Sequence, residues 1–597
     1  MNESFIHDHI KIITKQIEEL KNRSHQYSSL RLLLTIAYIY CFFQGYFKSS
    51  NFLYAISAIT FLIFIIIVIK HGKVKNELED EQLLKESYED ILKRKQQEWK
   101  SFQDCGAEFL DKDTTQAYDL DLFGKASLYQ FLCVAKTPYG RNALAKALTW
   151  KKGNKDDIVR NQQAIEELEH DVDGTMRFVQ LLKSFEKHSH KQKKQKLDMV
   201  FAMLKQETKK QTLVEQIISY VLPCITWIGI ILMVFFDQTY IVFSIGFTLS
   251  LCLSLLFTIR NSEILASVHD LHHVMQDYER MFLHLHKQDY KSAYLKDLQA
   301  TIDDSVQGSK ELHKVLTIVS LHHNFIMNIL LNGLFLMDFH GIHQYQKWQM
   351  TYGKRVEDWF ISVGEFERMA SLTQLSFAKE NTVFPKILDS KQPTFCFTKM
   401  HHPLLLEEHA KTNGFQATAS SYVITGSNMS GKTTFLRTIG LNMILAQAGA
   451  RICAKSGKLS CMHLYTSMRV QDDVSEGIST FYAEILRIKQ MMDESKKEEP
   501  MLVLIDEIFK GTNSADRIEC AIQAIRRLHR PWIITMVSTH DFELCDLEFD
   551  PNIEANNYHF SEYYEDDKIC FDYQLKDGRC QTTNAKQLMK LAGFFEE

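Results

Sequence analysis

The sequence contains few of the residues that interrupt regular structure. Only 8 of its 597 residues are proline and 24 are glycine. Proline breaks a helix and glycine weakens one, so their scarcity favours long helices. Outside its apolar runs, the region up to about residue 369 is also polar and rich in Gln, Lys and Glu, with helical periodicity. We therefore expect this region of the chain to be mostly α-helical.

The sequence also lacks closely spaced cysteines and a strong net charge. Its 12 cysteines are scattered without a C-x-x-C pair, and its net charge is -5. Scattered cysteines predict reduced, buried thiols in a cytoplasmic setting, and they argue against a disulfide framework or a zinc site. The near-neutral balance gives no global attraction to nucleic acid, so any such binding would depend on local basic patches.

Charged residues are missing altogether from four apolar runs, which form two close pairs. Residues 32–47 and 52–69 make the first pair, and residues 217–236 and 240–257 make the second. A helix needs about 20 apolar residues to cross the hydrocarbon core of a bilayer, and slightly shorter spans are tolerated. Each pair therefore predicts a transmembrane helical hairpin. The alternative, a helical pair in a soluble core, would require all four runs to be hidden, and a signal peptide would be a single shorter run.

Basic residues on the outer flanks of both hairpins predict their orientation. Lysine and arginine occur at Arg31, Lys70, the run 191–196 and Arg260. The positive-inside rule then places both termini and the large polar segments in the cytoplasm, with the chain in the inner (cytoplasmic) membrane. The same basic runs could contact anionic lipid or nucleic acid.

A glycine-rich motif follows the apolar strand candidate at 422–425. Its letters, G-S-N-M-S-G-K-T, fit the P-loop pattern G-x-x-x-x-G-K-[ST] and precede a helix-favouring stretch. In a P-loop, backbone N–H groups at a helix N-terminus face the phosphates, Lys432 supplies a positive charge and Thr433 can ligate Mg²⁺. We therefore expect ATP and Mg²⁺ as cofactors. The predicted nucleotide-binding residues are Gly426, Ser427, Asn428, Met429, Ser430, Gly431, Lys432, Thr433 and Thr434.

Two further apolar runs end in residues suited to the same chemistry. The run 501–505 ends in Asp506 and Glu507, and the run 532–537 leads to His540. Unbroken apolar runs are typical of buried parallel strands. Beside the P-loop strand, Asp506 can hold Mg²⁺, Glu507 can polarise the attacking water and His540 can contact the terminal phosphate. An ordinary acidic pair and a structural histidine are the alternatives.

The expected metal ligands are Thr433 and Asp506, and no metal other than Mg²⁺ is expected. Histidine pairs occur at 272–273 and 322–323, but no carboxylate or cysteine cluster joins them at ligand spacing. Histidines on helix surfaces or packed in the interior are the simpler interpretation. Upstream of the P-loop, Phe415 is a candidate for stacking on the base of the nucleotide.

Taken together, these motifs resemble those of the MutS family of ATPases, a branch of the ABC-type fold. The P-loop is similar to the family's G-P-N-M-G-G-K-[ST], with Ser427 and Ser430 substituted. Residues 479–484, S-T-F-Y-A-E, look like its S-T-F-x-x-E signature. Residues 506–512, D-E-I-F-K-G-T, are similar to its D-E-[IL]-G-R-G-T, and residues 538–540 match its [AS]-T-H loop.

Weaker likenesses to the family lie upstream. His402 and Pro403 are similar to the H-P segment before the nucleotide site, and residues 119–124, 137–140 and 364–372 look like pieces of its helical core and lever. The resemblance thus covers most of the chain from about residue 119, apart from the second hairpin.

The resemblance implies a homodimer with composite ATP sites, in which Ser479 faces the terminal phosphate bound by the partner subunit. Family members that act in mismatch repair carry an N-terminal domain that wedges an aromatic residue beside the mismatch through an F-x-E element. Here a membrane hairpin takes that place, and the sequence has no such element there. Mismatch recognition is therefore not expected from this region of the chain, and DNA, mismatched or branched, stays open as a client.

The sequence thus predicts a C-terminal α/β P-loop domain of ABC type, preceded by a mostly α-helical lever region that carries two transmembrane hairpins. The expected function is a membrane-anchored, Mg²⁺-dependent ATPase that moves its helical arms. The predicted domains are an N-terminal cytoplasmic helix (1–30), a first hairpin (31–70), a first segment of the helical core and lever (71–212), a second hairpin (213–259), a second segment of the helical core and lever (260–390) and the ATPase domain (391–597).

Two other functions stay open. An ABC-type transporter would have fused membrane helices, but here the spans are few, and S-T-F-x-x-E stands where transporters have L-S-G-G-Q. A membrane scaffold would bind ATP without turnover, but such a scaffold would not need Glu507.

Overall fold

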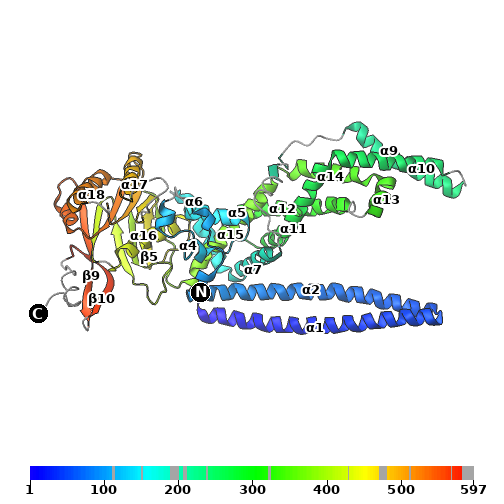
Figure 1. Ribbon diagram of the computed structural model, residues 1–597, viewed down its shortest axis with the longest axis horizontal. Helices are drawn as coiled ribbons and strands as arrows, with labels where there is room; N and C mark the ends of the chain where they lie inside the picture. Colours follow the sequence, from blue (N-terminus) through cyan, green and yellow to red (C-terminus); the bar gives the residue numbers. More distant parts are fainter. Residues whose placement is uncertain are drawn as a thin grey trace. The chain divides into compact units, whose positions relative to one another are not determined.

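The computed structural model describes residues 1–110, 115–149, 152–188, 201–202, 204–205, 212–236, 240–320, 325–427, 429–469, 480–509, 513–565 and 568–580. These residues divide into two compact units (Figure 1). The first unit comprises Met1–Ala135, Arg141–Gln180 and Glu367–Glu597, and the second comprises Lys136–Gly140 and Leu181–Phe366.

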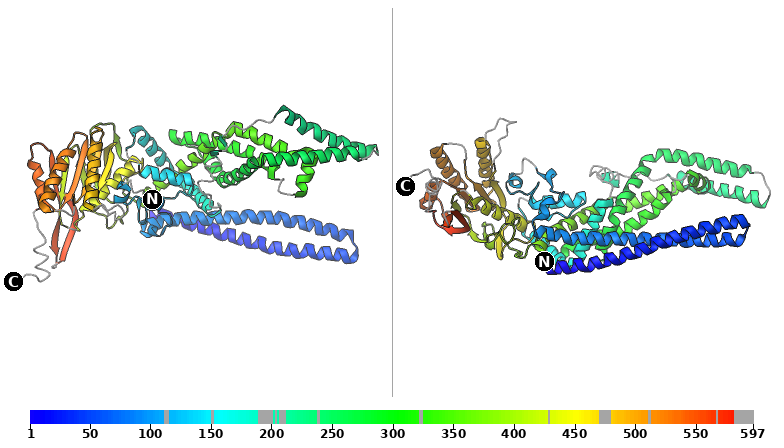
Figure 2. Two further views of the ribbon diagram at one scale, coloured as in Figure 1. Left: turned by 45° about the horizontal axis from the view of Figure 1, so that its top comes forward. Right: turned by 60° about the horizontal axis from the view of Figure 1, so that its bottom comes forward.

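Two long helices open the chain and lie side by side as a hairpin, α1 (Glu3–Lys48) and α2 (Asn51–Lys95) (Figures 1 and 2). Ser49 adopts the left-handed conformation that lets the chain reverse between them. Near the termini of the hairpin the facing side chains are buried, among them Ile6, Ile13 and Tyr88. At the turn end the apolar residues are exposed. Each predicted apolar run is therefore one half of a longer, unbroken helix.

A buried arginine fixes the end of α2. The Arg94 guanidinium donates to the backbone oxygens of Phe131 and Cys133 at 2.7 and 3.3 Å. Burial lowers the pKa of this arginine to about 10, and the carbonyl oxygens that accept its N–H groups satisfy a cation that water cannot reach. The elements that follow α2 along the chain are η1 (Glu98–Ser101), η2 (Ala107–Phe109), α3 (Thr115–Asp119), α4 (Leu128–Leu132), α5 (Pro138–Leu148), α6 (Lys155–His170) and α7 (Val172–His188).

In the part of the second unit that the structure describes, every regular element is a helix. Its core contains large aromatic residues such as Trp348, whose indole N–H donates to the oxygen of Gly308 at 2.8 Å. Trp359 packs so closely on Gly308 that a Cβ there would lie 2.4 Å from the indole ring. The helices are α9 (Leu213–Phe235), α10 (Ile241–Arg260), α11 (Ser262–His286), α12 (Ala293–Ser320), α13 (Phe325–Phe335), α14 (Met337–Tyr352) and α15 (Val356–Ala378), the last of which continues into the first unit.

Helices α9 and α10 form the second hairpin (Figure 2). Their backbones approach closely at glycines, because a Cβ on Gly229 would lie 2.5 Å from the Phe243 nitrogen and one on Gly246 would lie 2.8 Å from the Thr226 hydroxyl. Small residues at such crossings are typical of helix pairs in membranes. By length and composition, four helices of the described chain could cross a membrane, namely α1, α2, α9 and α10.

The C-terminal region of the chain forms two sheets. The larger has the strand order β10-β9-β4-β8-β7-β6, in which all neighbours are parallel except the antiparallel pair β9 and β10. The smaller sheet has the order β1-β5-β2-β3. The strands are β1 (Lys386–Leu388), β2 (Phe395–Met400), β3 (Asn413–Ala417), β4 (Ser421–Thr425), β5 (Ser456–Ser460), β6 (His463–Ser467), β7 (Met501–Asp506), β8 (Ile533–Thr539), β9 (Ala555–Glu565) and β10 (Lys568–Asp577).

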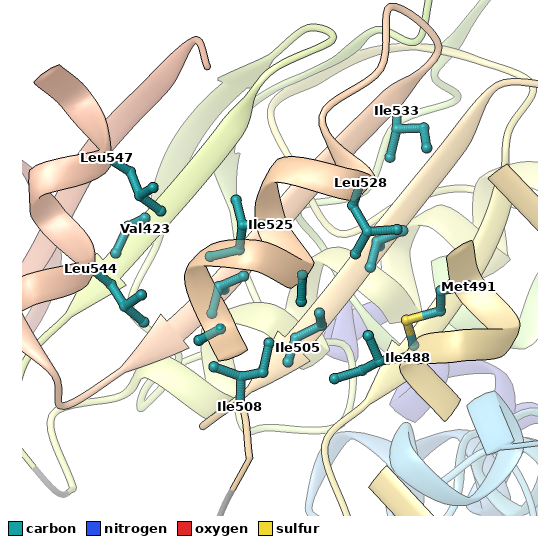
Figure 3. Packing of buried hydrophobic residues seen from close by; sticks show 14 of the residues in the cluster. Val423, Ile488, Met491, Ile505, Ile508, Ile525, Leu528, Ile533, Leu544 and Leu547 are labelled. Carbon is teal, nitrogen blue, oxygen red and sulfur yellow. The ribbon is translucent and has the colours of Figure 1, made fainter. Parts of the chain in front are cut away.

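Helices cover the larger sheet. On one face, α17 (Thr480–Ser495), α18 (Ser514–Leu528) and the 3-10 helix η4 (Phe542–Phe549) pack over the central strands (Figure 3). Val423, Ile505 and Ile533 point from three strands into this layer. The alternate strand residues are equally buried, and α16 (Lys432–Gln447) contacts β7 and β8. Strands buried on both faces explain the unbroken apolar runs.

The coarse fold prediction is confirmed: a mostly helical region precedes a C-terminal α/β domain with mixed sheets. The three predicted strands correspond to β4, β7 and β8. One expectation was incomplete, because the stretch from residue 259 to about 369 was predicted to be polar and helical, whereas α13 within it is apolar.

Candidate functional site

Three neighbouring parallel strands of the larger sheet end at the same edge. β4 pairs with β8 so that Thr425 lies opposite Thr539, and β8 pairs with β7 so that Ser538 lies opposite Asp506. The residues that follow each strand must therefore emerge together at this carboxyl edge, where α/β proteins bind ligands. These following residues are Gly426, Glu507 and His540.

The loop 426–431 joins β4 to α16 and depends on two glycines. A Cβ on Gly426 would lie 2.7 Å from the Phe560 oxygen, and Gly431 has a φ of 109°. Met429 also has a positive φ and is 85% exposed. The Ser430 hydroxyl is buried and has no hydrogen-bond partner within the described chain. A loop of this kind before a helix N-terminus suits an anion, and the orphaned hydroxyl offers it one more donor.

Lys432 curls back into this loop. Its ammonium donates to the oxygens of Gly426 and Ser427 at 2.8 and 2.9 Å and lies 3.4 Å from Nε2 of His540. The side chain is buried, so the positive charge is held inside the loop rather than in solvent. The Ser427 hydroxyl in turn donates to Glu562 on β9 at 2.8 Å. The loop thus presents a fixed cation at the point where strand β4 ends.

Oxygen ligands for a hard cation gather beside the lysine. The Thr433 hydroxyl donates to one carboxylate oxygen of Asp506 at 2.7 Å, and the Ser538 hydroxyl donates to the other oxygen. A hydroxyl and a carboxylate are the donor types that Mg²⁺ prefers, since it binds oxygen almost exclusively. The predicted metal ligands Thr433 and Asp506 therefore lie together and offer donor atoms that fit Mg²⁺.

A carboxylate–imidazole pair completes the edge. Glu507 Oε1 lies 3.0 Å from His540 Nε2, and both side chains are partly exposed. Glu507 has a φ of 53°, an unfavourable region for a side chain with a Cβ, and the backbone is held there because its N–H donates to the Ser538 oxygen at 2.9 Å. The carboxylate of this residue faces the histidine.

Glu484 holds the segment that follows β7 and Glu507, and it was not among the predicted site residues. Its buried carboxylate accepts the N–H of Phe509 at 2.6 Å, and Phe509 also has a positive φ. Glu484 closes the S-T-F-Y-A-E stretch, so that motif contained the signal. Ser479, which opens the stretch, and Asn428 of the loop lie outside the described residues, while α17 begins at the next position, Thr480. Thr434 is exposed on the first turn of α16.

The prediction that Phe415 stacks on the base of the nucleotide is wrong in this structure. Its ring is 4% exposed and lies 5.4 to 5.5 Å from the rings of Tyr422, Phe435 and Tyr558, so it belongs to the core. Tyr573 is the exposed aromatic residue beside the loop. A Cβ on Gly431 would lie 3.1 Å from its ring.

Tyr573 lies at a bulge in β10 and has a φ of 55°. Asn413 holds this bulge, since its amide donates to the Tyr573 oxygen at 3.0 Å and accepts the N–H of Leu575 at 2.8 Å. No local sequence signal marks the position, because the bulge depends on a contact between residues about 160 positions apart.

Two aspartates of the upstream segment 119–124 bind directly to the C-terminal α/β domain. Asp119 is fully buried and accepts hydrogen bonds from the Thr466 hydroxyl and from the N–H groups of Met468 and Arg469. Burial raises the pKa of its carboxyl group, and these hydrogen bonds oppose the rise. Asp121 pairs with Arg469 and with Arg437 on α16. The segment thus joins α16 to the chain that leads toward Ser479.

The histidine of the H-P segment, His402, is a partly buried, neutral group. His402 Nδ1 accepts the N–H of Leu404 at 3.2 Å. Burial, together with the nearby Arg437 cation, lowers its pKa to about 3. This histidine therefore stays uncharged at neutral pH and is not one of the ionising groups of the site.

Comparison with known proteins identifies this domain. A family model described as MutS domain V matches residues 422–597. The C-terminal half of this chain is MutS-like. Over 313 residues, 51% of the chain, it is 27% identical to a DNA mismatch repair protein MutS of Persephonella marina and covers 33% of that protein. It is 31% identical over 179 residues to the protein so named in Natronomonas pharaonis, and 33% identical over 175 residues to that of Thermus caldophilus.

The MutS-like match is confined to a portion of each relative. The last two alignments cover 30% and 29% of this chain and 21% of each of those proteins. The chain thus spans about a third or less of the length of the relatives it matches. What the matches support is a MutS-type ATPase domain at the C-terminus.

Proposed function

We propose that the chain is a membrane-anchored, MutS-like ATPase that binds Mg²⁺ and ATP at the loop 426–431 and hydrolyses the nucleotide. The observation that carries the proposal is the meeting of three chemistries at one sheet edge. They are the Lys432 cation, the Thr433–Asp506 pair and the Glu507–His540 pair. Transfer of a phosphoryl group to water needs a charge for the phosphates, oxygen ligands for Mg²⁺ and a carboxylate for the water.

Each residue has a stated role in this proposal. Lys432 would exchange its bonds to the loop oxygens for bonds to the phosphates. Bound Mg²⁺ would neutralise phosphate charge, and Thr433 and Asp506 would hold it, directly or through water. Glu507 would accept a proton from the attacking water, while His540 orients that carboxylate and contacts the terminal phosphate. Tyr573 would stack on the adenine base, since its exposed ring lies beside Gly431.

We further propose a homodimer with composite ATP sites. Ser479 immediately precedes α17, and in a dimer it would face the terminal phosphate bound by the partner subunit. If so, Ser479→Ala and Lys432→Ala subunits should complement each other at one of the two sites of a mixed dimer. An ATPase rate that stays proportional to concentration in a strictly monomeric preparation would refute the composite site.

The membrane anchor is proposed from the two helical hairpins, whose apolar helices expose most of their side chains. Both termini and the ATPase domain would then lie in the cytoplasm, at the inner (cytoplasmic) membrane. The nucleotide cycle would move the helical arms, and α15, one of the helices that run from one unit into the other, could carry this movement. DNA, mismatched or branched, is the proposed client, because the relatives are named for mismatch repair.

The test is the ATPase rate of the detergent-purified full chain with and without homoduplex, mismatched and branched DNA. Glu507→Gln is the matched control, since Gln keeps the size of the side chain but is no base. We expect Mg²⁺-dependent turnover in the wild type, a loss of about 10²-fold or more in Glu507→Gln, and retained ATP binding. Equal rates would refute hydrolysis, and stimulation by small solutes in liposomes would favour a transporter.

The DNA client has its own criterion. DNA that stimulates the ATPase should do so less as salt rises, because counterion release dominates such binding. If no DNA changes the rate or binds at low salt, nucleic acid is excluded as the client while the ATPase proposal stands.

A further inference from the structure

Helix α13 is a short apolar helix that packs against the second hairpin. Its 11 residues span about 16 Å, half of the roughly 30 Å core of a bilayer. A Cβ on Gly333 would lie 2.2 Å from the ring of Phe247 in α10, and the Phe335 ring lies 5.6 Å from Trp227 in α9. Both partners lie well inside their helices, so α13 meets the hairpin along its apolar length and not at its ends.

The exposed face of α13 is apolar, whereas its buried side contains a polar residue. Ile326 is 68% exposed, and Met327, Leu330 and Phe335 are exposed as well. Asn332 is 2% exposed, and its amide donates to the side-chain oxygen of Asn328 one turn earlier. A helix on a water-soluble surface has the reverse pattern, with its polar face outward. The outward face of α13 is therefore suited to an apolar surrounding.

The backbone break after α13 is satisfied by protein groups. Leu336 is left-handed, with a φ of 50°, and α14 begins at the next residue. The N–H of Asp338 donates to the Asn332 side-chain oxygen at 3.0 Å. The Asp338 carboxylate accepts the hydroxyls of Thr258 and Ser254 from α10 at 2.9 and 3.3 Å. Non-helical backbone at membrane depth is tolerated only where protein satisfies it in this way.

We infer that α13 is a re-entrant membrane element whose outward face, formed by Ile326, Met327 and Leu330, contacts lipid acyl chains. The hairpin helix α10 that α13 packs against exposes apolar residues as well, since Ile245 is 61% exposed and Leu249 is also exposed. The inference rests on the proposed anchoring of α9 and α10, since the same lipid must surround both surfaces. The hairpin and α13 then enter the membrane as one bundle, whose interior holds the apolar cluster of Leu222, Phe257 and Leu336 together with the hydrogen-bonded Asn332 and Asp338.

The test is photocrosslinking with the full chain in vesicles of phosphatidylethanolamine and phosphatidylglycerol. The photoreactive residue p-benzoyl-phenylalanine replaces Ile326 in one variant and Leu330 in a second, which repeats the test if the first does not fold. A variant with the photoreactive residue at Ile245 on α10 tests whether the hairpin itself is in the membrane. A variant at Lys347, which is exposed on α14 outside the apolar surface, is the negative control. Lipid adducts are detected by mass spectrometry.

We expect lipid adducts from positions 326 and 330 at a yield within about threefold of that from 245, and none from 347. Adducts at 245 but not at 326 or 330 would overturn the α13 inference and leave the anchor intact. No adduct at any position would overturn the anchor as well. Crosslinks from 326 to another region of the protein would assign the face to a protein contact and so refute the inference.

Discussion

The substitution Asp119→Asn tests whether the upstream segment stabilises the ATPase domain. One carboxylate oxygen accepts the Thr466 hydroxyl at 2.7 Å and the Met468 N–H at 3.0 Å. The other accepts the Arg469 N–H at 3.0 Å and lies 3.6 Å from the Arg487 guanidinium. An asparagine offers only one oxygen, so in either orientation its NH₂ group must face a backbone N–H.

The expected cost follows from these contacts. Loss of one hydrogen bond to a charged acceptor costs about 1.5–3 kcal/mol, and the buried N–H is left without a partner. The raised pKa of Asp119 shows that burial already disfavours its charge, and the neutral asparagine avoids that cost. We therefore expect a net loss of about 2 kcal/mol. For a domain of this size this lowers the melting temperature by about 4–8 °C.

The assay is thermal unfolding of the detergent-purified chain, followed together with its ATPase rate. Asp121→Asn is the matched control, because that carboxylate is 37% exposed and its ion pairs with Arg437 and Arg469 are worth less than about 1 kcal/mol. We expect a clearly larger melting shift for Asp119→Asn, with a lower ATPase rate because Arg469 leads toward Ser479. Equal shifts, or an unchanged melting temperature for Asp119→Asn, would refute the reasoning.

Three further outcomes are expected. Tyr573→Ala should raise the KM for ATP several-fold at unchanged kcat, while Tyr573→Phe keeps the wild-type KM; an unchanged KM in the alanine variant removes the ring from the base site. His402 binds its proton near pH 6.5 when unfolded but only near pH 3 when folded, so stability should fall by about 1.4 kcal/mol per pH unit below 6.5, and a His402→Gln variant should show a shallower slope in pH-dependent melting. Ile505→Ala, in the core of Figure 3, should cost about 2–5 kcal/mol, whereas substitution of exposed Lys347 to Ala should change the melting temperature little.

The elements of the fold that were predictable are those with a strong local signal. Strands β4, β7 and β8 are buried on both faces, so their sequences are unbroken apolar runs, and each ends in polar residues that the sheet brings to one edge. Because parallel neighbours share the direction of their carboxyl ends, the meeting of Asp506 and His540 with the loop 426–431 followed from the sequence.

What could not be predicted depends on contacts between distant residues. Tyr573 reaches the loop through a bulge held by Asn413, and Asp119 binds residues about 350 positions later. Helix α13 escaped notice because two asparagines interrupt its short apolar run, and its orientation depends on contacts with α9 and α10, which are distant in the sequence. The positive φ of Glu507 likewise arises from the pairing of β7 with β8, since its N–H bonds to Ser538.

The unbroken helices of the first hairpin fix the distance between its apolar portion and its buried, polar end. The polar half of α1 runs from Glu3 to about residue 31 and that of α2 from about residue 70 to Lys95, so each is roughly 40 Å long at 1.5 Å per residue. If the apolar portions lie in a bilayer, the opposite end of the hairpin, where Ile6 and Tyr88 are buried, is separated from the lipid headgroups by most of this length. The hairpin would then act as a rigid spacer, and the width of the gap it maintains would limit the size of any client that reaches the domain from the membrane side.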